Sequence, residues 1–130
     1  MQIIDSKYNK GFSSVTIQTP IGHFTGKAYL HPDDKEIGTC YTGWRIAEQR
    51  ALIKYYKAHI RKEKNIIKGI IEFYDYFPSQ DNVEVYENLY YQHTNQIKDW
   101  KRKIQENLDN IKNIEDTIEQ RKKQKQNKIN

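Results

Sequence analysis

The feature that most constrains the fold is a heptad repeat between Val83 and Arg121. Its a positions are all apolar, and four of the six are isoleucine: Val83, Tyr90, Ile97, Ile104, Ile111 and Ile118. Its d positions are mixed: Tyr86, His93, Trp100, Asn107, Ile114 and Arg121. This repeat predicts an amphipathic helix with a coiled-coil-like seam, about 58 Å long at about 1.5 Å per residue. Asn107 and Arg121 cost stability on such a seam but can set its register.

A second helix is predicted over about residues 42–77, because this stretch lacks proline and repeats apolar residues every seven positions. Thr42 is a plausible N-cap, and Pro78 ends the pattern before the longer helix begins at about residue 80. The longer helix, expected over about 80–120, exceeds what one small β-layer can cover. We therefore expect it to pair partly with the 42–77 helix and partly with another copy of the chain.

Residues 1–41 have the alternation of β-strands. Strands are predicted at 14–19 and 23–30, joined by the turn sequence "PIG", and "MQIIDS" is a candidate third strand. The predicted inward residues include Val15, Ile17, Phe24, Ala28 and Leu30. Gly26 marks either a bulge or a close approach to the backbone, and residues 31–39 are expected to form a loop.

These elements predict an α+β fold: a small N-terminal antiparallel sheet followed by two long C-terminal helices. They are expected to form a single domain over residues 1–120. A mean hydropathy of −1.00 is low for a self-sufficient core, which favours a homo-oligomer. Residues 121–130 carry five cations and no anions, and they are predicted to be a disordered basic tail.

Composition and motifs argue against several classes of protein. The N-terminus lacks the apolar region of a signal peptide, and no run approaches the roughly 20 apolar residues of a membrane span, so we expect a cytoplasmic protein. One cysteine excludes an internal disulfide framework, and the four histidines have no metal-ligand spacing. Without a phosphate loop or a nucleophile motif, we expect neither an enzyme nor a cofactor.

Cations recur at intervals of three and four between Arg50 and Lys68, and so form one basic stripe on the predicted helix. The stripe comprises Arg50, Lys54, Lys57, Arg61, Lys64 and Lys68. Such a stripe is either a solvated or docked helix face, or a surface that follows the phosphates of a nucleic acid. The first interpretation is favoured.

The stretch "CYTGWRIAEQR" has the chemistry of an anion site at a helix start. If Thr42 is the N-cap, the N–H groups of Gly43, Trp44 and Arg45 are unbonded, and Arg45 and Arg50 add charged donors. Tyr41 and Trp44 offer flat faces for a base. The residues alone equally support a structural interpretation, in which Trp44 packs on the sheet and the arginines pair with Glu48 or other acids.

The block "TPIGHFTGKAYLHPDDKEIGTCYTGWRIAEQRALIKYYK", residues 19–57, resembles the first Thoeris anti-defence family of phage proteins. Its pattern is T-P-x-G-x-F-x-G-x-A-x-x-H-P-x-D, followed by T-G-x-x-I-A-E-x-R-A-x-I-K. The resemblance covers about a third of the chain directly. The predicted layout, sheet before long helices, is also similar.

The resemblance implies a non-enzymatic oligomer, a dimer or a hexamer, in the cytoplasm of an infected bacterium. It would bind a cyclic ADP-ribose isomer made by a bacterial immune enzyme and withhold it from the effector; some members also hold cyclic trinucleotides. Positions expected to bind ligand lie in or beside the shared block: Phe24, Gly26, Tyr41, Thr42, Gly43, Arg45 and Arg50.

Two other functions remain open. One is an anti-CRISPR-like phage inhibitor that binds nucleic acid or a defence protein through the basic stripe. The other is a structural coiled-coil adaptor that binds neither class of ligand.

Overall fold

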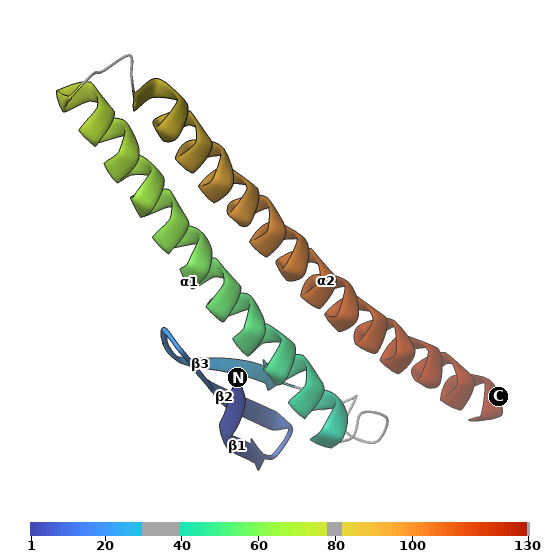
Figure 1. Ribbon diagram of the computed structural model, residues 1–130. Coiled ribbons are helices and arrows are strands. Elements are labelled where there is room, and N and C mark those ends of the chain that lie inside the picture. The colour runs from blue at the N-terminus through green and yellow to red at the C-terminus, as the bar shows by residue number, and fades with distance from the viewer. Residues whose placement is uncertain (30–39, 78–81, 130) are drawn as a thin grey trace. The chain divides into compact units, whose positions relative to one another are not determined.

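The computed structural model describes residues 1–29, 40–77 and 82–129 (Figure 1). Three strands come first: β1 Gln2–Asn9, β2 Phe12–Thr19 and β3 Gly22–Tyr29. Two long helices follow: α1 Cys40–Tyr76 and α2 Val83–Ile129. The predicted α+β class and order of elements are therefore confirmed. The predicted loop over residues 31–39, Leu30 and Pro78 lie outside the described residues.

The chain divides into two compact units. The sheet unit contains Met1–Tyr55 and Gln105–Asn130, and the helical unit contains Tyr56–Ile104. Both helices contribute to both units, so the boundary falls within continuous helices rather than in a linker. The sequence predicted one domain over residues 1–120 and contained no signal for this division.

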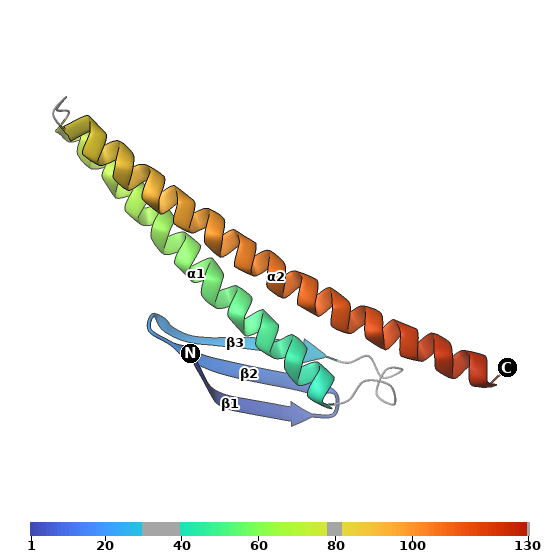
Figure 2. The same cartoon turned by 45° about the vertical axis from the view of Figure 1, so that its right-hand side comes forward.

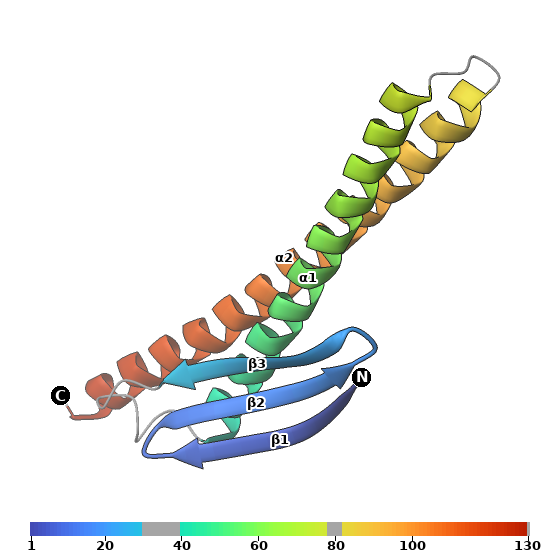
Figure 3. The same ribbon diagram turned by 90° about the vertical axis from the view of Figure 1, so that its left-hand side faces the viewer.

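The sheet is antiparallel with the order β1-β2-β3 (Figure 3). Lys10 and Gly11 join β1 to β2 with φ angles of 48° and 87°, which suits a tight turn that follows the twist of the strands. Thr19 closes the next turn, because its hydroxyl donates to the Gly22 carbonyl at 2.7 Å. The predicted third strand is present as β1, which begins at Gln2 rather than Met1 and continues to Asn9.

Alternation along β2 creates the buried face of the sheet. Ser13, Val15, Ile17 and Thr19 are buried on this face, as predicted for the valine and isoleucine. Over this face lies the first part of α1, which contributes Ile46, Ala47, Ala51 and Ile53 to the core (Figure 2).

Gly26 sets how closely α1 approaches β3. A Cβ atom on Gly26 would lie 1.9 Å from the Ala47 carbonyl oxygen and 2.3 Å from the Ala51 nitrogen. The β2–β3 register continues through Gly26 without a shift, so it marks no bulge. The register shift in the sheet lies instead in β1, between Ile3 and Asp5. Of the two sequence interpretations, close approach is confirmed, and the approaching group is helix backbone.

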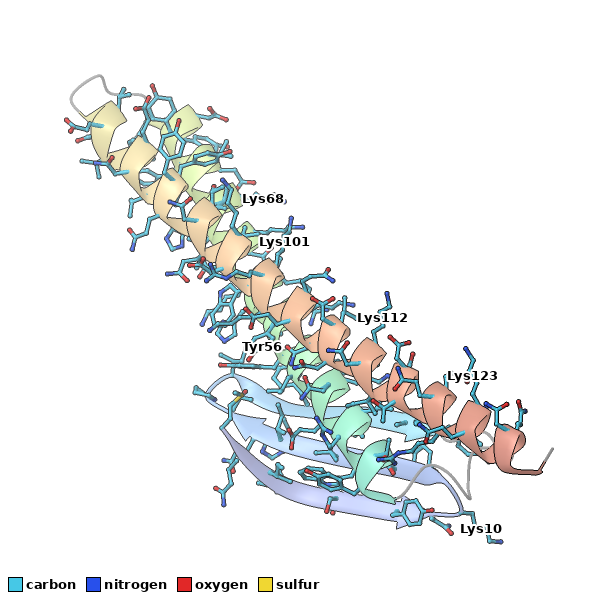
Figure 4. All side chains as sticks on the ribbon, turned by 90° about the vertical axis from the view of Figure 1, so that its right-hand side faces the viewer. Lys10, Tyr56, Lys68, Lys101, Lys112 and Lys123 are labelled. Atoms are coloured by element: carbon cyan, nitrogen blue, oxygen red, sulfur yellow. The ribbon has the colours of Figure 1, made fainter. Side chains whose placement is uncertain are left out.

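In the sheet unit, the end of α2 buries four of the five predicted a and d positions, and the fifth, Arg121, is exposed. The buried residues are Asn107, Ile111, Ile114 and Ile118. Asn107 Nδ2 donates to Gln49 Oε1 on α1 at 2.6 Å, which ties the two helices together within this unit. Lys112 and Lys123 project from α2 on the side away from the sheet (Figure 4).

In the helical unit, α1 and α2 meet through Ile60 and Ile97 and through stacked rings. The His59 and Trp100 rings lie 4.2 Å apart and nearly parallel, at 7°, and Tyr56 stacks on Trp100 at 5.6 Å. Lys103 places its ammonium 4.7 Å from the Trp100 ring. His93 Nδ1 contacts Glu63 Oε2 at 2.5 Å. In this unit His59 therefore packs by ring stacking, and His93 makes a polar contact between the helices.

Two predicted boundaries differ from the structure. Helix α1 begins at Cys40, so Thr42 lies in the first helical turn and is not the N-cap. Helix α2 continues to Ile129, where a disordered tail was predicted from residue 121. The tail contains neither glycine nor proline and is rich in the helix formers Lys and Gln. Its cations also lie at the negative end of the helix dipole, where positive charge is favourable.

Candidate functional site

A groove in the sheet unit brings together three of the predicted site residues. Tyr41, Thr42 and Arg45 line it from the first turns of α1. The last third of α2 supplies the opposite wall, with Asn110, Asn113, Ile114, Thr117, Ile118 and Arg121. Its volume is about 350 Å³, near the lower end of the usual range for small-molecule pockets. We call it the arginine groove.

The arginine groove is suited to an anion. Two guanidinium groups, Arg45 and Arg121, reach it from different helices, and none of its described lining residues is acidic. Neither arginine makes an ion pair within residues 1–29, 40–77 and 82–129. The described residues therefore do not support the interpretation in which Arg45 pairs with Glu48 or another acid. Planar guanidinium forks match the geometry of phosphate oxygens.

Polar side chains between the two arginines add uncharged groups. Asn110 Nδ2 donates to Gln49 Oε1 at 3.2 Å, and the Thr117 hydroxyl donates to the Asn113 carbonyl at 2.9 Å. Both side chains are exposed, so water or a ligand can reach them. The buried side chains of Ile114 and Ile118 supply apolar surface beside them.

Tyr41 provides a flat ring at the edge of this groove. The ring is stacked on Trp44 with centroids 6.2 Å apart and planes inclined by 14°, and the Arg45 guanidinium carbon lies 5.8 Å from its centroid. Tyr41 is nevertheless 63% exposed, so ring surface remains accessible. An aromatic face beside guanidinium groups is the chemistry that holds a base next to its phosphates.

The other predicted site residues lie outside the lining of the arginine groove. Phe24 is half-buried and packs on Tyr55, with ring centroids 5.7 Å apart. Gly26 is covered by the backbone of α1, which explains this glycine without a ligand. Arg50 Nη1 donates to the Lys27 carbonyl at 2.8 Å, and Gly43 is buried.

The helix start also changes which backbone N–H groups lie at the positive end of α1. Because α1 begins at Cys40, the N–H groups at its positive end are those of the turn from Cys40 to Thr42. Those of Gly43, Trp44 and Arg45, expected from the sequence, lie farther along the helix. The side chains of Thr42 and Arg45, rather than the backbone at Gly43, connect this end of α1 with the groove.

Sequence reasoning missed Arg121 and the polar residues of α2 as groove residues. Arg121 was interpreted only as a polar d position and as the first residue of the basic tail, and Asn110 and Asn113 were given no role. A usable signal was present: a cation at a seam position is disfavoured unless something offsets its charge. That α2 ends beside the start of α1 was not visible in the sequence.

Other chemistry that needs clustered side chains is not found in the described part of the chain. There, no group of three or more histidine, cysteine, aspartate or glutamate side chains could hold a metal ion. Burial, followed by the charge of Lys62, lowers the pKa of His59, which favours its neutral form. The six side chains of the basic stripe are all exposed, and only Lys68 has an ion-pair partner among the described residues, Glu72 at 4.0 Å.

No described helix combines the length and apolar character that crossing a bilayer requires. Comparison of the chain with protein-family models, curated proteins and solved structures finds no match.

Proposed function

We propose that this protein is a non-enzymatic sponge that binds a cyclic ADP-ribose-type signalling nucleotide and thereby blocks bacterial anti-phage defence. The observation that carries the proposal is the arginine groove, where Arg45 and Arg121 converge without an acidic neighbour in the described lining. The resemblance of residues 19–57 to the first Thoeris anti-defence family supports the same ligand class, with cyclic trinucleotides as a second candidate. The site of action would be the cytoplasm of the infected host.

The chemistry of the groove suits retention of a ligand. Guanidinium groups bind the pyrophosphate, the neighbouring amides and hydroxyls bind ribose oxygens, and the Tyr41 ring contacts the base. Sequestration needs affinity without turnover, so it needs no general base, nucleophile or cofactor. A protein made in large amounts then lowers the free concentration of the signal by mass action.

The proposal includes a homo-oligomer, and the surface of the helical unit supports this part. Large apolar side chains are exposed there: Ile66, Ile71, Phe73, Tyr76, Phe77, Val85, Leu89, Tyr90 and Tyr91. Each aromatic side chain can bury on the order of 150–250 Å². Monomeric proteins rarely expose several such side chains together. A dimer or hexamer, with coiled-coil-like packing between copies, would cover these residues.

Calorimetry with cyclic ADP-ribose tests the binding proposal. Arg45→Ala and Arg121→Ala should each weaken binding by about 10- to 150-fold, the effect of losing a charged hydrogen bond. Arg61→Ala is the matched control, because Arg61 is exposed on α1 but does not line the groove. Ligand recovered after heat denaturation should be intact.

Two results would contradict the proposal. One is a wild-type protein that binds neither cyclic ADP-ribose nor a cyclic trinucleotide. The other is recovery of hydrolysed ligand, which would indicate an enzyme.

The alternative, an inhibitor that binds nucleic acid or a defence protein, is favoured by the exposure of the whole basic stripe. It predicts binding to DNA or RNA whose affinity falls steeply with salt. Changing Lys57, Arg61 and Lys64 to glutamine should then abolish binding. Deleting residues 122–130 should weaken it while leaving Arg121 in the groove.

A further inference from the structure

A second groove lies in the sheet unit, where the first turns of α1 pass over the β1–β2 strand pair. It has a volume of about 280 Å³ and is lined by Ser6, Lys7, Tyr8, Ser13, Tyr41 and Trp44. Three of these six residues are aromatic, and none is acidic. We call it the ring groove.

Ser13 gives the ring groove an unusual polar group. It faces the core side of β2 and is only 1% exposed, yet its hydroxyl has no hydrogen-bond partner among the described residues. Thr19 on the same face of β2 does have one, because its hydroxyl donates to the Gly22 carbonyl. A buried hydroxyl without a partner destabilises the folded state.

Packing alone gives no reason for a serine at this position. Ser13 pairs in register with Ala28 of β3, and both residues are buried, so an alanine is already accommodated beside it. An alanine at position 13 would avoid the cost of the buried hydroxyl. A ligand that bonds to the hydroxyl would offset that cost, which is the usual reason for keeping a polar atom in a pocket.

Tyr41 is common to both grooves. Its stacking on Trp44 joins it to the ring groove, and its contact with the Arg45 guanidinium joins it to the arginine groove. One molecule that extends past Tyr41 can therefore contact both sites. Its anionic part would contact the two arginines of the arginine groove. The remainder would contact the aromatic rings and the Ser13 hydroxyl of the ring groove.

We propose that the ring groove is the nucleobase subsite of this protein. The base stacks against Tyr8, Tyr41 or Trp44, and an atom at its edge forms a hydrogen bond with the Ser13 hydroxyl. This assignment rests on the proposed function and specifies which part of the nucleotide enters which groove. We assign the phosphates to Arg45 and Arg121 rather than to Lys7, because Lys7 is exposed and already pairs with Asp5 at 3.7 Å.

Ser13→Ala separates a ligand role from a structural role. Binding of cyclic ADP-ribose, measured by calorimetry, should weaken by about 2- to 13-fold, the range for one neutral hydrogen bond. Binding of ribose 5-phosphate, which lacks the base, should not change. The melting temperature without ligand should stay the same or rise, because the variant removes an unpartnered buried hydroxyl.

Tyr8→Leu tests the stacking surface independently of Ser13. Tyr8 is 54% exposed, so its replacement should leave the fold intact while weakening cyclic ADP-ribose binding by about 5- to 150-fold. Tyr29→Leu is the matched control, because Tyr29 is an exposed strand tyrosine that lines neither groove.

The failures of the two proposals are distinguishable. If the wild-type protein binds cyclic ADP-ribose and both variants bind it equally well, the nucleobase subsite is wrong while the sponge function stands. The subsite is also wrong if Ser13→Ala lowers the melting temperature and weakens the binding of cyclic ADP-ribose and ribose 5-phosphate equally. The hydroxyl would then be structural. If the wild-type protein binds neither cyclic ADP-ribose nor a cyclic trinucleotide, both proposals fall.

Discussion

Single residues show most directly how this sequence is fitted to its fold. Gly26 was ambiguous in the sequence, since a glycine in a strand indicates either a bulge or a close neighbour. The structure resolves it, because the backbone of α1 occupies the space that a side chain would need. Predicting this outcome would have required knowing which turn of α1 crosses β3, and no local pattern encodes that.

Gly26→Ala should lower the free energy of unfolding by about 3 kcal/mol or more, because a methyl group cannot fit against helix backbone. Gly69→Ala is the control: a methyl group there would meet no neighbouring atom within 4 Å, so it should raise stability by about 0.5–1 kcal/mol through helix propensity. Urea unfolding of both variants measures the difference. Equal stability of the two would contradict the packing at Gly26.

We expect His59 to make the stability of the fold depend on pH. Burial and Lys62 lower its pKa below the ordinary value of about 6.5, so the unfolded chain takes up the proton first as the pH falls. The contribution of His59 to the free energy of unfolding should therefore be complete above about pH 6.5. It should decrease below that pH until His59 is also protonated in the folded protein.

Melting temperatures between pH 7.5 and pH 5 measure this effect. His59→Phe keeps a ring against Trp100 but cannot titrate, so its melting temperature should fall less than that of the wild type. Gln18→Phe is the control, because Gln18 is an exposed residue of β2 without an ionisable group, and it should retain the wild-type slope. A His59→Phe variant with that same slope would exclude His59 as the source.

At the scale of elements, the heptad pattern predicted α2 well over most of its length. The buried positions of α2 in the sheet unit are a and d positions. They include Asn107, whose Oδ1 is buried without a partner among the described residues. The end of the helix was not predicted, because loss of apolar periodicity was taken as loss of helix. Periodicity reports burial, whereas Lys- and Gln-rich sequence can continue as an exposed helix.

Asn107→Leu should raise the free energy of unfolding by about 1 kcal/mol, because it replaces a half-satisfied buried amide with apolar volume. In this variant, Asn110 Nδ2 would still donate to Gln49 Oε1. Asn113→Leu, at an exposed position of α2, should change stability by less than about 0.5 kcal/mol. Guanidinium unfolding compares them, and a destabilised Asn107→Leu would show that the Asn107–Gln49 bond outweighs the unpartnered oxygen.

At the scale of the whole molecule, the exposed apolar side chains of the helical unit are the feature that a single chain leaves unexplained. Three of them, Ile71, Tyr90 and Tyr91, line a groove of about 230 Å³ together with Ile70, Tyr74, Val83, Tyr86 and Glu87. Low mean hydropathy had suggested self-association from composition alone. The structure adds which surface is uncovered, and this makes the expectation specific enough to test.

Ile71→Glu combined with Tyr91→Glu should reduce the sedimenting species to a monomer, because each charge would be buried in the proposed contact between copies. The wild type should show a larger species, and its melting temperature should rise with protein concentration. Tyr29→Glu, at an exposed residue of the sheet unit, is the control and should not dissociate it. A wild-type monomer at all concentrations would refute self-association.

The sequence by itself determined the class and order of elements, because strand alternation, a turn at "PIG" and helical repeats are local patterns that neighbouring residues enforce. It also pointed to Tyr41, Thr42 and Arg45, since rings and cations at a helix start have recognisable chemistry. Only the tertiary structure decided that Gly26 and Arg50 meet other parts of the chain, and that Arg121 and Ser13 line grooves with Tyr41. These outcomes depend on contacts between residues far apart in sequence, and such contacts are set by how whole elements pack.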